Sequence, residues 1–590
     1  MTPFRGYFNY TTTTDGQASF SCSGHLRTPA NPLEQYNQRG ISFLNQISGE
    51  FSALIIDPSH ATQYLIRDKI GIFPLYYAIR NSEFYYSQNL KDFFNLYGFD
   101  FAPDSEGLAD FLLPGRNPNP DLKITSFANI FAVKPGHYLQ INQQGVKEFE
   151  YWDFNTSNVI YYSNKTDYVA HFRELYIQAV KRRLSLTGNT AVSLSGGLDS
   201  STLYAVANTI KSTDHNIIGV SYTSDIYGDC DEKIFLKLLA DKYVSSPILQ
   251  YRIEDQDDFL SMAYDQTIAI EEPFIDYLWP VTRNIYQLAQ SSDADVLLTG
   301  HWGDQLLFSQ DYLLDFLKNG QIKKIREHLR QYKKWCTPTE YLFYRNYFVR
   351  EAIKLFLPQQ LIKLVRQIKG LIKKPRSDEV LSPLLHFSSA ESGIKKSFHS
   401  LHAQSLYQIV KSKYHVRCME WNFKTAQHFN MKVTFPMLDE DLIQFLISIP
   451  GDAISSDGIP RNIIREAFKE ILPESITNRT WKADFTEVVN SRVENEWLNI
   501  VRILQDDPIC VKSGLANPAE LNKRLKWSRG SDCSFSWEII DYLGLELWFK
   551  YFGGNNEKNR TPYKEKIYQT EIRSEGNSQR ANEGQGGWCQ

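Results

Sequence analysis

A chain of 590 residues is too long to fold around a single hydrophobic core, so we expect two or more domains. Charged residues make up only 22% of the sequence and the formal net charge is −4, which argues against nucleic acid as a partner of the whole protein. The seven cysteines show no Cys-x-x-Cys spacing and the 12 histidines form no metal-ligand pattern, as is typical of a cytoplasmic enzyme with reduced thiols. The sequence has no run of about 18 apolar residues and no apolar signal segment near Met1, so we expect neither secretion nor membrane association.

Short β segments separated by turns fill the first part of the chain. The strand candidates lie at 51–57, where Pro58 ends the segment, and at 64–68, 75–78 and 84–87. Because strands dominate here, we expect a β-sandwich domain over residues 1–150. A polar stretch at 151–165 is predicted to be a linker, and a second domain is expected over 166–552.

The stretch 191–201 begins as a short apolar run, breaks at two glycines and resumes with helical spacing at Leu203, which predicts a strand, a tight loop and a helix. Such a loop points backbone N–H groups and the positive end of a helix at the space above the strand, which suits a phosphate. No lysine follows the glycines, so this is not the P-loop of GTPases and ATPases. The nucleotide-binding candidates are Leu194, Ser195, Gly196, Gly197, Asp199, Ser200 and Ser201.

Residues 296–307 repeat this arrangement, with Thr299 and Gly300 at the break as further nucleotide-binding candidates. Strands that alternate with helices predict a mostly parallel sheet, whose ligands lie at the carboxyl ends of the strands. Both breaks therefore fall on the same rim, where Asp199 and Asp304 can share one Mg²⁺ ion. An alternative role for Asp304 is to cap the following helix, and the two roles are compatible.

These motifs resemble a known enzyme family. The sequence Ser-Gly-Gly-Leu-Asp-Ser-Ser at 195–201 looks like the pyrophosphate-binding loop of the N-type ATP pyrophosphatases, which cleave ATP between the α and β phosphates to adenylate a carboxylate. The stretches 48–51, 67–77 and 133–137 resemble the glutaminase half of asparagine synthetases, and 299–304 and 433–439 resemble blocks of their synthetase half. The resemblance covers nearly all of 1–550. It implies an α/β protein with a glutaminase-like β-sandwich of Ntn type, followed by a parallel-sheet ATP pyrophosphatase domain of HUP-like fold that uses ATP and Mg²⁺.

The glutaminase half departs from the family pattern where its chemistry should be. A working glutaminase of this type has a cysteine after Met1 as its N-terminal nucleophile, and here that residue is Thr2. The Asn-Gly-Glu and Arg-Gly-Pro stretches that hold glutamine in the family are also missing. We therefore expect residues 1–150 to be a degenerate, structural glutaminase fold. A hydrolase that uses Thr2 as its nucleophile is the alternative.

The residue at position 301 varies with the chemistry across the family. Asparagine synthetases have a glutamate there and the β-lactam-forming relatives a tyrosine, whereas His301 resembles the lasso peptide cyclases, which form macrolactams. A neutral imidazole is suited to taking a proton from an ammonium nucleophile, and the alternative is a histidine that only packs at the helix start. Glu272 could supply a partner carboxylate for His301 or for the substrate amine, with surface charge on a helix end as the alternative.

Two cationic residues complete the catalytic candidates. Asparagine synthetases place a lysine where Arg461 stands, to stabilise charge on the phosphate and the acyl intermediate. Arginine keeps that charge and can fork onto two oxygens, but the change puts an asparagine-forming reaction in doubt. The stretch 479–485 again resembles lasso cyclases, and within it Lys482 is the second cationic candidate, with a solvent-facing lysine as the alternative.

Two further segments have no assigned chemistry. Basic and aromatic residues interleave over 330–376, which suits a membrane-surface helix, a contact for an acidic peptide or protein, or amphipathic helices with a solvated basic face. A closing helix is predicted over 536–549, and the polar, glycine-rich composition of 553–590 predicts a disordered tail.

Together these features predict an ATP-dependent amide-forming ligase that releases AMP and pyrophosphate. By resemblance, it closes a macrolactam between the N-terminal amine of a precursor peptide and an Asp or Glu side chain, beside a leader peptidase and a leader-recognition protein. The alternatives are an ammonia-dependent asparagine synthetase and a non-catalytic nucleotide-binding scaffold. The paired candidates Asp199 and Asp304 weigh against the scaffold.

Overall fold

The structure is a computed structural model that describes residues 5–9, 17–28, 30–112, 121–185, 188–255, 259–276, 278–308, 310–357, 396–527 and 537–553. The tail predicted to be disordered lies outside these ranges beyond Gly553. Thr2 and the residues from 358 to 376 also lie outside them.

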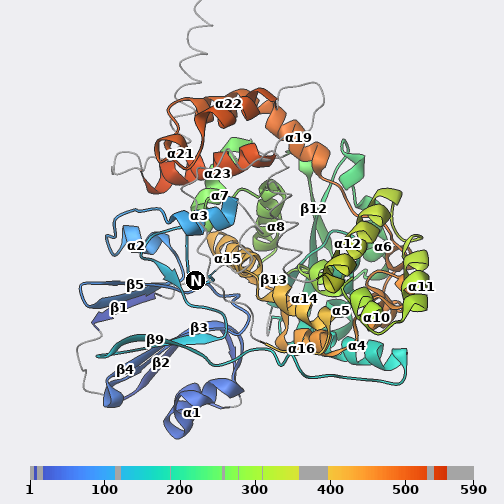
Figure 1. The fold of residues 1–590 in the computed structure, drawn as a ribbon, viewed down its shortest axis with the longest axis horizontal. Coiled ribbons are helices and arrows are strands. Elements are labelled where there is room, and N and C mark those ends of the chain that lie inside the picture. The colour runs from blue at the N-terminus through green and yellow to red at the C-terminus, as the bar shows by residue number, and fades with distance from the viewer. Residues whose placement is uncertain are drawn as a thin grey trace, which may run out of the picture.

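Two antiparallel sheets build the N-terminal unit and pack face to face, which confirms the predicted sandwich (Figure 1). One sheet has the order β1 (Arg5–Asn9), β6 (Glu83–Ser87), β5 (Tyr76–Arg80), β7 (Phe131–Ala132), and the other β2 (Ser19–Arg27), β3 (Ser48–Asp57), β4 (Thr62–Arg67), β8 (His137–Asn142), β9 (Gly145–Glu150). Apolar side chains of both sheets meet in one cluster, with Leu65 and Leu139 from one sheet and Tyr77 and Phe84 from the other. The helices of this unit are α1 (Pro32–Arg39), α2 (Lys91–Asn95) and α3 (Ser105–Leu112).

A parallel sheet forms the centre of the second unit, as the alternation of strands and helices predicts. Its order is β12 (Ile248–Arg252), β11 (His215–Thr223), β10 (Gly188–Ser193), β13 (Ala294–Leu298), β14 (Lys432–Thr434). From β10, successive strands are added on one side as β11 and β12. On the other side of β10 the sheet continues with β13 and β14, so the strand order reverses between β10 and β13. Ligands of open α/β sheets bind at such a switch point.

Helices cover this sheet on both sides. Figure 1 shows α8 (Trp279–Ser291) and α15 (Lys413–His428) on the side that faces the N-terminal unit, and α5 (Leu198–Ile210) and α6 (Lys233–Lys242) on the other. The other helices are α4 (Lys165–Lys181), α7 (Phe259–Ile270), α9 (Gly303–Leu307), α10 (Tyr312–Lys318), α11 (Ile322–Tyr332), α12 (Pro338–Phe356), α14 (Leu401–Val410), α16 (Glu440–Ser448), α17 (Asn462–Phe468), α18 (Glu474–Thr477), α19 (Thr486–Asn495), α20 (Trp497–Gln505), α21 (Ile509–Lys512), α22 (Pro518–Trp527) and α23 (Trp537–Phe552). Within the described ranges, none of the helices combines the length and the apolar character needed to cross a bilayer.

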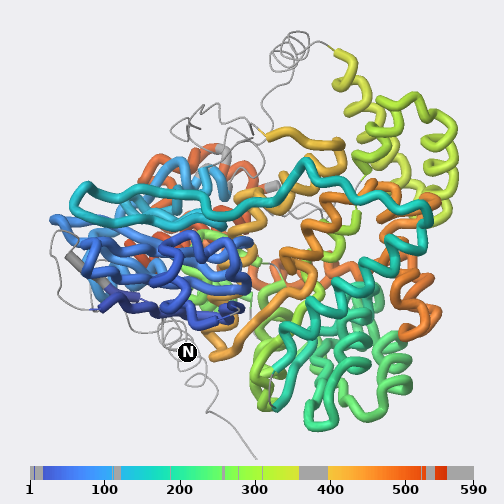
Figure 2. Tube along the Cα trace, turned by 90° about the horizontal axis from the view of Figure 1, so that it is seen from below, coloured from blue at the N-terminus to red at the C-terminus, as the bar shows by residue number. Residues whose placement is uncertain are grey.

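The two ends of the described chain share one hydrophobic core. Figure 1 shows α23 above the N-terminal unit, and in Figure 2 the red C-terminal segments lie behind the light-blue part of that unit. The ring of Trp548 in α23 lies 4.9 Å from that of Phe127, and both belong to a cluster that also contains Tyr76 of β5 and Leu260 of α7. The N-terminal unit therefore completes its core with residues from the far end of the sequence.

A buried set of ion pairs crosses the same junction. Arg67 at the end of β4 is fully buried and pairs with Glu420 of α15 at 2.9 Å. Three backbone carbonyls also accept hydrogen bonds from the Arg67 guanidinium. Glu420 in turn accepts a hydrogen bond from the Tyr76 hydroxyl at 3.0 Å and pairs with Arg417 at 3.2 Å. These contacts tie the N-terminal unit to the helix that lies against the parallel sheet.

We expect Glu420→Ala to destabilise the protein severely. The substitution leaves two arginine side chains buried without a shared carboxylate, and breaking a buried pair in this way costs about 3–5 kcal/mol. Thermal unfolding followed by circular dichroism checks this, with Glu466→Ala as the matched control because Glu466 is a helical glutamate in an exposed pair with Lys469 at 2.9 Å. The control should unfold near the wild-type temperature. An unchanged Tm for Glu420→Ala would contradict this account of the junction.

Candidate functional site

The two glycine breaks follow neighbouring strands, β10 and β13, whose residues Val192 and Leu298 pair at the end of the register. A Cβ atom at Gly300 would lie 2.9 Å from the backbone nitrogen of Ser200, so glycine allows the two loops to pack backbone against backbone. Asp199 and Asp304 each stand in the first turn of the helix that follows. The structure thus brings the two predicted nucleotide motifs together at the switch point of the sheet.

Hydroxyl groups shape the loop after β10. The Ser195 backbone N–H donates to the Ser200 hydroxyl at 3.1 Å, and the two serine hydroxyls lie 3.0 Å apart. Gly197 precedes α5 as its N-cap and offers no side chain to cap it. The N–H groups in the first turn of α5 consequently remain available to an anion.

The other loop candidates anchor this turn to the sheet. The backbone N–H of Leu194 donates to the Val220 carbonyl at 2.9 Å, and the Leu194 carbonyl accepts a hydrogen bond from the Ser221 hydroxyl at 2.5 Å. The Ser201 hydroxyl is buried and has no hydrogen-bond partner in the part of the chain that the structure describes. The Thr299 N–H donates to the Thr434 carbonyl at 3.2 Å, which fixes the second loop against β14.

Arg461 joins the two carboxylates. Its guanidinium Nη1 lies 2.8 Å from Asp199 and 2.6 Å from Asp304. Lys482 forms an ion pair with Asp304 from the other side, while most of its side chain stays exposed, so this lysine is both paired and solvent-facing. Asp199, Asp304, Arg461 and Lys482 thus form one cluster in which two cations balance two anions.

Asp199 carries the strongest sign of a ligand site in this cluster. Burial raises the pKa of the Asp199 carboxyl to about 6, although Arg461 opposes the shift, and the neighbouring Asp304 charge raises the pKa further. Its Oδ1 atom is buried without a hydrogen-bond partner among the described residues. Within those residues, no group of three His, Cys, Asp or Glu side chains could hold a metal by itself. Two carboxylates fit Mg²⁺, which takes most of its ligands from phosphate and water.

His301 stands between the two glycines of the second loop. Its Nδ1 lies 2.9 Å from the Thr299 hydroxyl, whose donor or acceptor role depends on the imidazole tautomer. The ring remains accessible to solvent, but the protein crowds around it, and this desolvation lowers the pKa of the imidazole below its usual value. The next residue, Trp302, has a φ of +73° and packs its ring 4.1 Å from that of His415 on α15. A left-handed tryptophan is strained and fixes the direction in which His301 leaves the loop.

Glu272 is not brought to this cluster by its contacts. Its carboxylate accepts a hydrogen bond from Ser126 at 2.5 Å and pairs with Arg417 at 2.6 Å. Both Glu271 and Glu272 are almost fully buried, so the alternative of exposed charge at a helix end is wrong. Glu272 is buried and bound to Arg417, which lies 145 positions later in the chain, so it belongs to the junction between the units. A local sequence pattern cannot predict a partner so far away.

Arg479 is a functional candidate that the sequence reasoning did not single out. Its guanidinium binds Glu232 at 2.6 Å and 2.9 Å, and donates to the Gly196 carbonyl at 3.1 Å. The aromatic rings of Phe235 and Trp481 lie 4.3 Å and 3.9 Å from it. Arg479 therefore fastens the Lys482 segment to the loop after β10. The sequence signal that could have indicated Arg479 is its position three residues before the candidate Lys482.

A part of the basic and aromatic segment packs against the site, while other apolar side chains of this segment, such as Phe343 and Phe356, are exposed. Tyr332 and Tyr344 stack at 4.1 Å and are buried, so they belong to the core of the α10–α12 helices. A Cβ atom at Gly458, just before Arg461, would lie 2.9 Å from the backbone nitrogen of Tyr332. Helix α11 thus packs directly on the turn that leads to Arg461, whose own φ is +56°.

Comparison with known proteins accounts for both units. The asparagine synthase family model matches residues 171–550, and the glutamine amidotransferase domain model matches residues 32–152. The glutamine-hydrolyzing asparagine synthetase 3 of Bacillus subtilis is 22% identical over 546 residues, which is 88% of this chain and 82% of that protein. Asparagine synthetase 2 of the same organism is 25% identical over 75% of this chain and 55% of that protein. A putative asparagine synthetase 2 of Methanocaldococcus jannaschii is 24% identical over 50% of this chain and 56% of that protein. The chain therefore belongs to the asparagine synthase family and is an ATP-dependent C–N ligase.

Proposed function

We propose that this ligase adenylates a side-chain carboxylate of a peptide and closes a macrolactam with the N-terminal amine of the same peptide. Thr2 in place of the nucleophilic cysteine, together with the missing glutamine-binding stretches, leaves the N-terminal unit without a source of ammonia. The charged cluster of the ligase unit is complete. In this proposal the amine arrives as part of the substrate. The observation that carries the proposal is an accessible histidine, His301, at the position beside this cluster where asparagine-forming relatives have a glutamate.

The charged residues divide the work of the first half-reaction. Bound Mg²⁺ would be held by Asp199 and Asp304 and would withdraw charge from the phosphates. Arg461 can form two hydrogen bonds with phosphate oxygens, and Lys482 adds a mobile positive charge as pyrophosphate leaves. Arg479 holds the loop after β10 in place through its hydrogen bond to the Gly196 carbonyl while pyrophosphate leaves.

The second half-reaction needs a neutral amine. His301 has a lowered pKa, so its imidazole is uncharged at neutral pH and can take the proton from the peptide ammonium group. Apolar surface for a peptide is present beside the cluster. The Trp481 side chain, next to Lys482, is 49% exposed and that of Phe308, next to α9, is 37% exposed. A precursor peptide is thus the proposed partner, together with a leader peptidase and a leader-recognition protein.

An ammonia-dependent asparagine synthetase is the second candidate, because the relatives are named as glutamine-hydrolyzing asparagine synthetases and the glutaminase residues are not found here. The two candidates differ in the nucleophile that attacks the acyl-adenylate. Purified protein should convert ATP to AMP with a linear peptide that carries Asp or Glu seven to nine residues after its N-terminus, and mass spectrometry should show the loss of one water from the peptide. Efficient synthesis of asparagine from aspartate and ammonia, with such peptides left linear, would refute the macrolactam proposal.

Two substitutions should separate the half-reactions. Asp199→Ala removes a carboxylate from the nucleotide cluster, so ATP–pyrophosphate exchange and amide formation should both be lost. His301→Asn removes only the proposed base, so exchange should persist while single-turnover amide formation falls about 10²-fold or more. Equal loss of both steps in His301→Asn would rule out its role as the base. The exposed Lys469→Met variant serves as the control for both measurements.

The two groups also predict the dependence on pH. Protonation of His301 removes the base, and because its pKa lies below the usual histidine value, amide formation should stay level from pH 8 down past neutrality and fall only in acid. Asp199, with a pKa of about 6 in the free protein, should reduce nucleotide binding as the pH falls through that value. In His301→Asn, the residual amide formation should no longer show the fall in rate that comes from protonation of His301. The fall of ATP–pyrophosphate exchange in acid, which comes from Asp199, should remain. A wild-type rate that falls already between pH 8 and 7 would contradict the assignment.

A further inference from the structure

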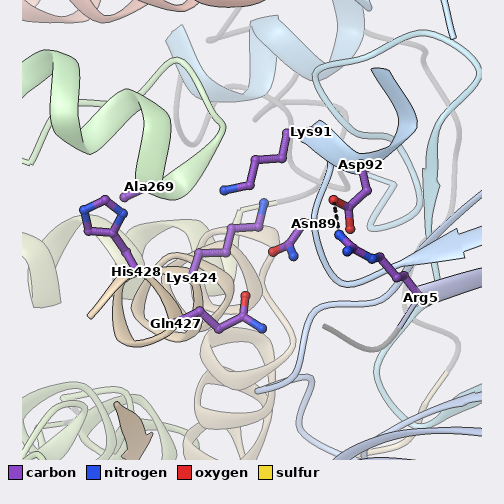
Figure 3. Close-up of a pocket in the computed structure, with 8 residues that line it drawn as sticks. All are labelled: Arg5, Asn89, Lys91, Asp92, Ala269, Lys424, Gln427 and His428. Atoms are coloured by element: carbon purple, nitrogen blue, oxygen red, sulfur yellow. Dashed lines mark hydrogen bonds and ion pairs between the residues drawn. The ribbon is translucent and has the colours of Figure 1, made fainter. Parts of the chain in front are cut away.

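A second site lies at the junction of the two units. A cavity of about 190 Å³ opens there between the N-terminal unit and helices α7 and α15 (Figure 3). Arg5 of β1 and Asn89, Lys91 and Asp92 around the start of α2 line one side, and Lys424 and Gln427 of α15 line the other. None of these six residues belongs to the nucleotide cluster. The cavity is therefore not part of the ligase site described above.

Asn89 is the residue that points to a ligand. It is only 7% exposed, and Figure 3 shows its side chain directed into the cavity. Its backbone N–H donates to the Ser87 hydroxyl, but its side-chain amide forms no hydrogen bond within the described ranges. The residue as a whole is buried, and its amide faces the cavity, where it can bond to a ligand or to water.

The charge around the cavity favours an anion. Arg5 and Asp92 form an ion pair at 2.9 Å and cancel each other, as the dashed line in Figure 3 indicates. Lys91 and Lys424 lie 3.4 Å and 3.1 Å from the same buried carboxylate, Glu271, so two ammonium groups share one negative charge. The Lys424 side chain is 1% exposed, and solvent therefore does little to screen its charge. One positive charge is left over for an occupant.

The size of the cavity limits that occupant. Pockets for drug-sized ligands measure about 300–1,000 Å³, and this cavity is smaller. We propose that it binds a small metabolite with one carboxylate or phosphate group, whose anionic oxygens contact Lys91 and Lys424. Asn89 and Gln427 donate to or accept from the polar groups of that ligand.

Isothermal titration of the full-length protein tests this site. The nucleotide site is first filled with Mg²⁺ and a non-hydrolysable ATP analogue, so that its own affinity for phosphate does not contribute. Inorganic phosphate and glycolate, a small hydroxy-carboxylate, are then titrated separately at constant ionic strength. We expect one of them to bind with a stoichiometry of one. Lys91→Met and Asn89→Leu should each weaken that binding about tenfold or more.

Lys134→Met is the matched control, because Lys134 is a half-buried lysine of the same unit in a single ion pair, with Glu148 at 2.8 Å. It should bind the probe as tightly as the wild type does. Phosphate binding alone would identify a phosphorylated ligand, and glycolate binding alone a carboxylate ligand. Absence of binding by both probes, or equal weakening in Lys134→Met and Lys91→Met, would overturn the proposal. Lys91 is partly exposed, so its variant remains informative if Asn89→Leu fails to fold.

Discussion

The guanidinium of Arg461, held between Asp199 and Asp304, is the interaction on which the ligase site depends. Two carboxylates in the first turns of the helices that follow neighbouring parallel strands would repel each other strongly in a half-buried position. Arg461 offsets this repulsion, and Lys482 supplies the second positive charge. The cluster is therefore electrically balanced by itself. In the proposed reaction the phosphates of ATP would require additional positive charge there, which the proposed Mg²⁺ would supply.

Backbone geometry around the cluster is as demanding as its charges. Gly300 lets the second loop approach Ser200, whereas Trp302 and Arg461 both adopt left-handed conformations that cost side-chain-bearing residues free energy. Packing compensates for that strain: His415 contacts the Trp302 ring, and helix α11 packs on the turn before Arg461. The catalytic candidates are consequently fixed by contacts with α15 and α11, which lie outside the nucleotide motifs.

The sequence predicted that most residues of the candidate site would lie together, because its motifs are local. Glycines at the ends of apolar runs predict strand–loop–helix turns, and parallel-sheet topology alone brings Asp199 and Asp304 to one rim. Glu272 shows where such reasoning stops, since its role depends on Arg417, which is far away in sequence. The clamp between Arg479 and Glu232 joins residues 247 positions apart and was missed for the same reason. The buried junction pair of Arg67 and Glu420, 353 positions apart, is likewise a product of tertiary packing.

The position of Trp548 also bears on how this protein folds during translation. Its ring completes the core around Phe127, yet it lies in α23, the last helix of the described ranges. The N-terminal sandwich is translated first, so a part of its apolar surface is not covered by α23 until that helix has been synthesised. A nascent chain that stalls before that helix would expose this surface to aggregation and to chaperones. The N-terminal unit and α23 are thus parts of one core, although they lie at opposite ends of the described chain.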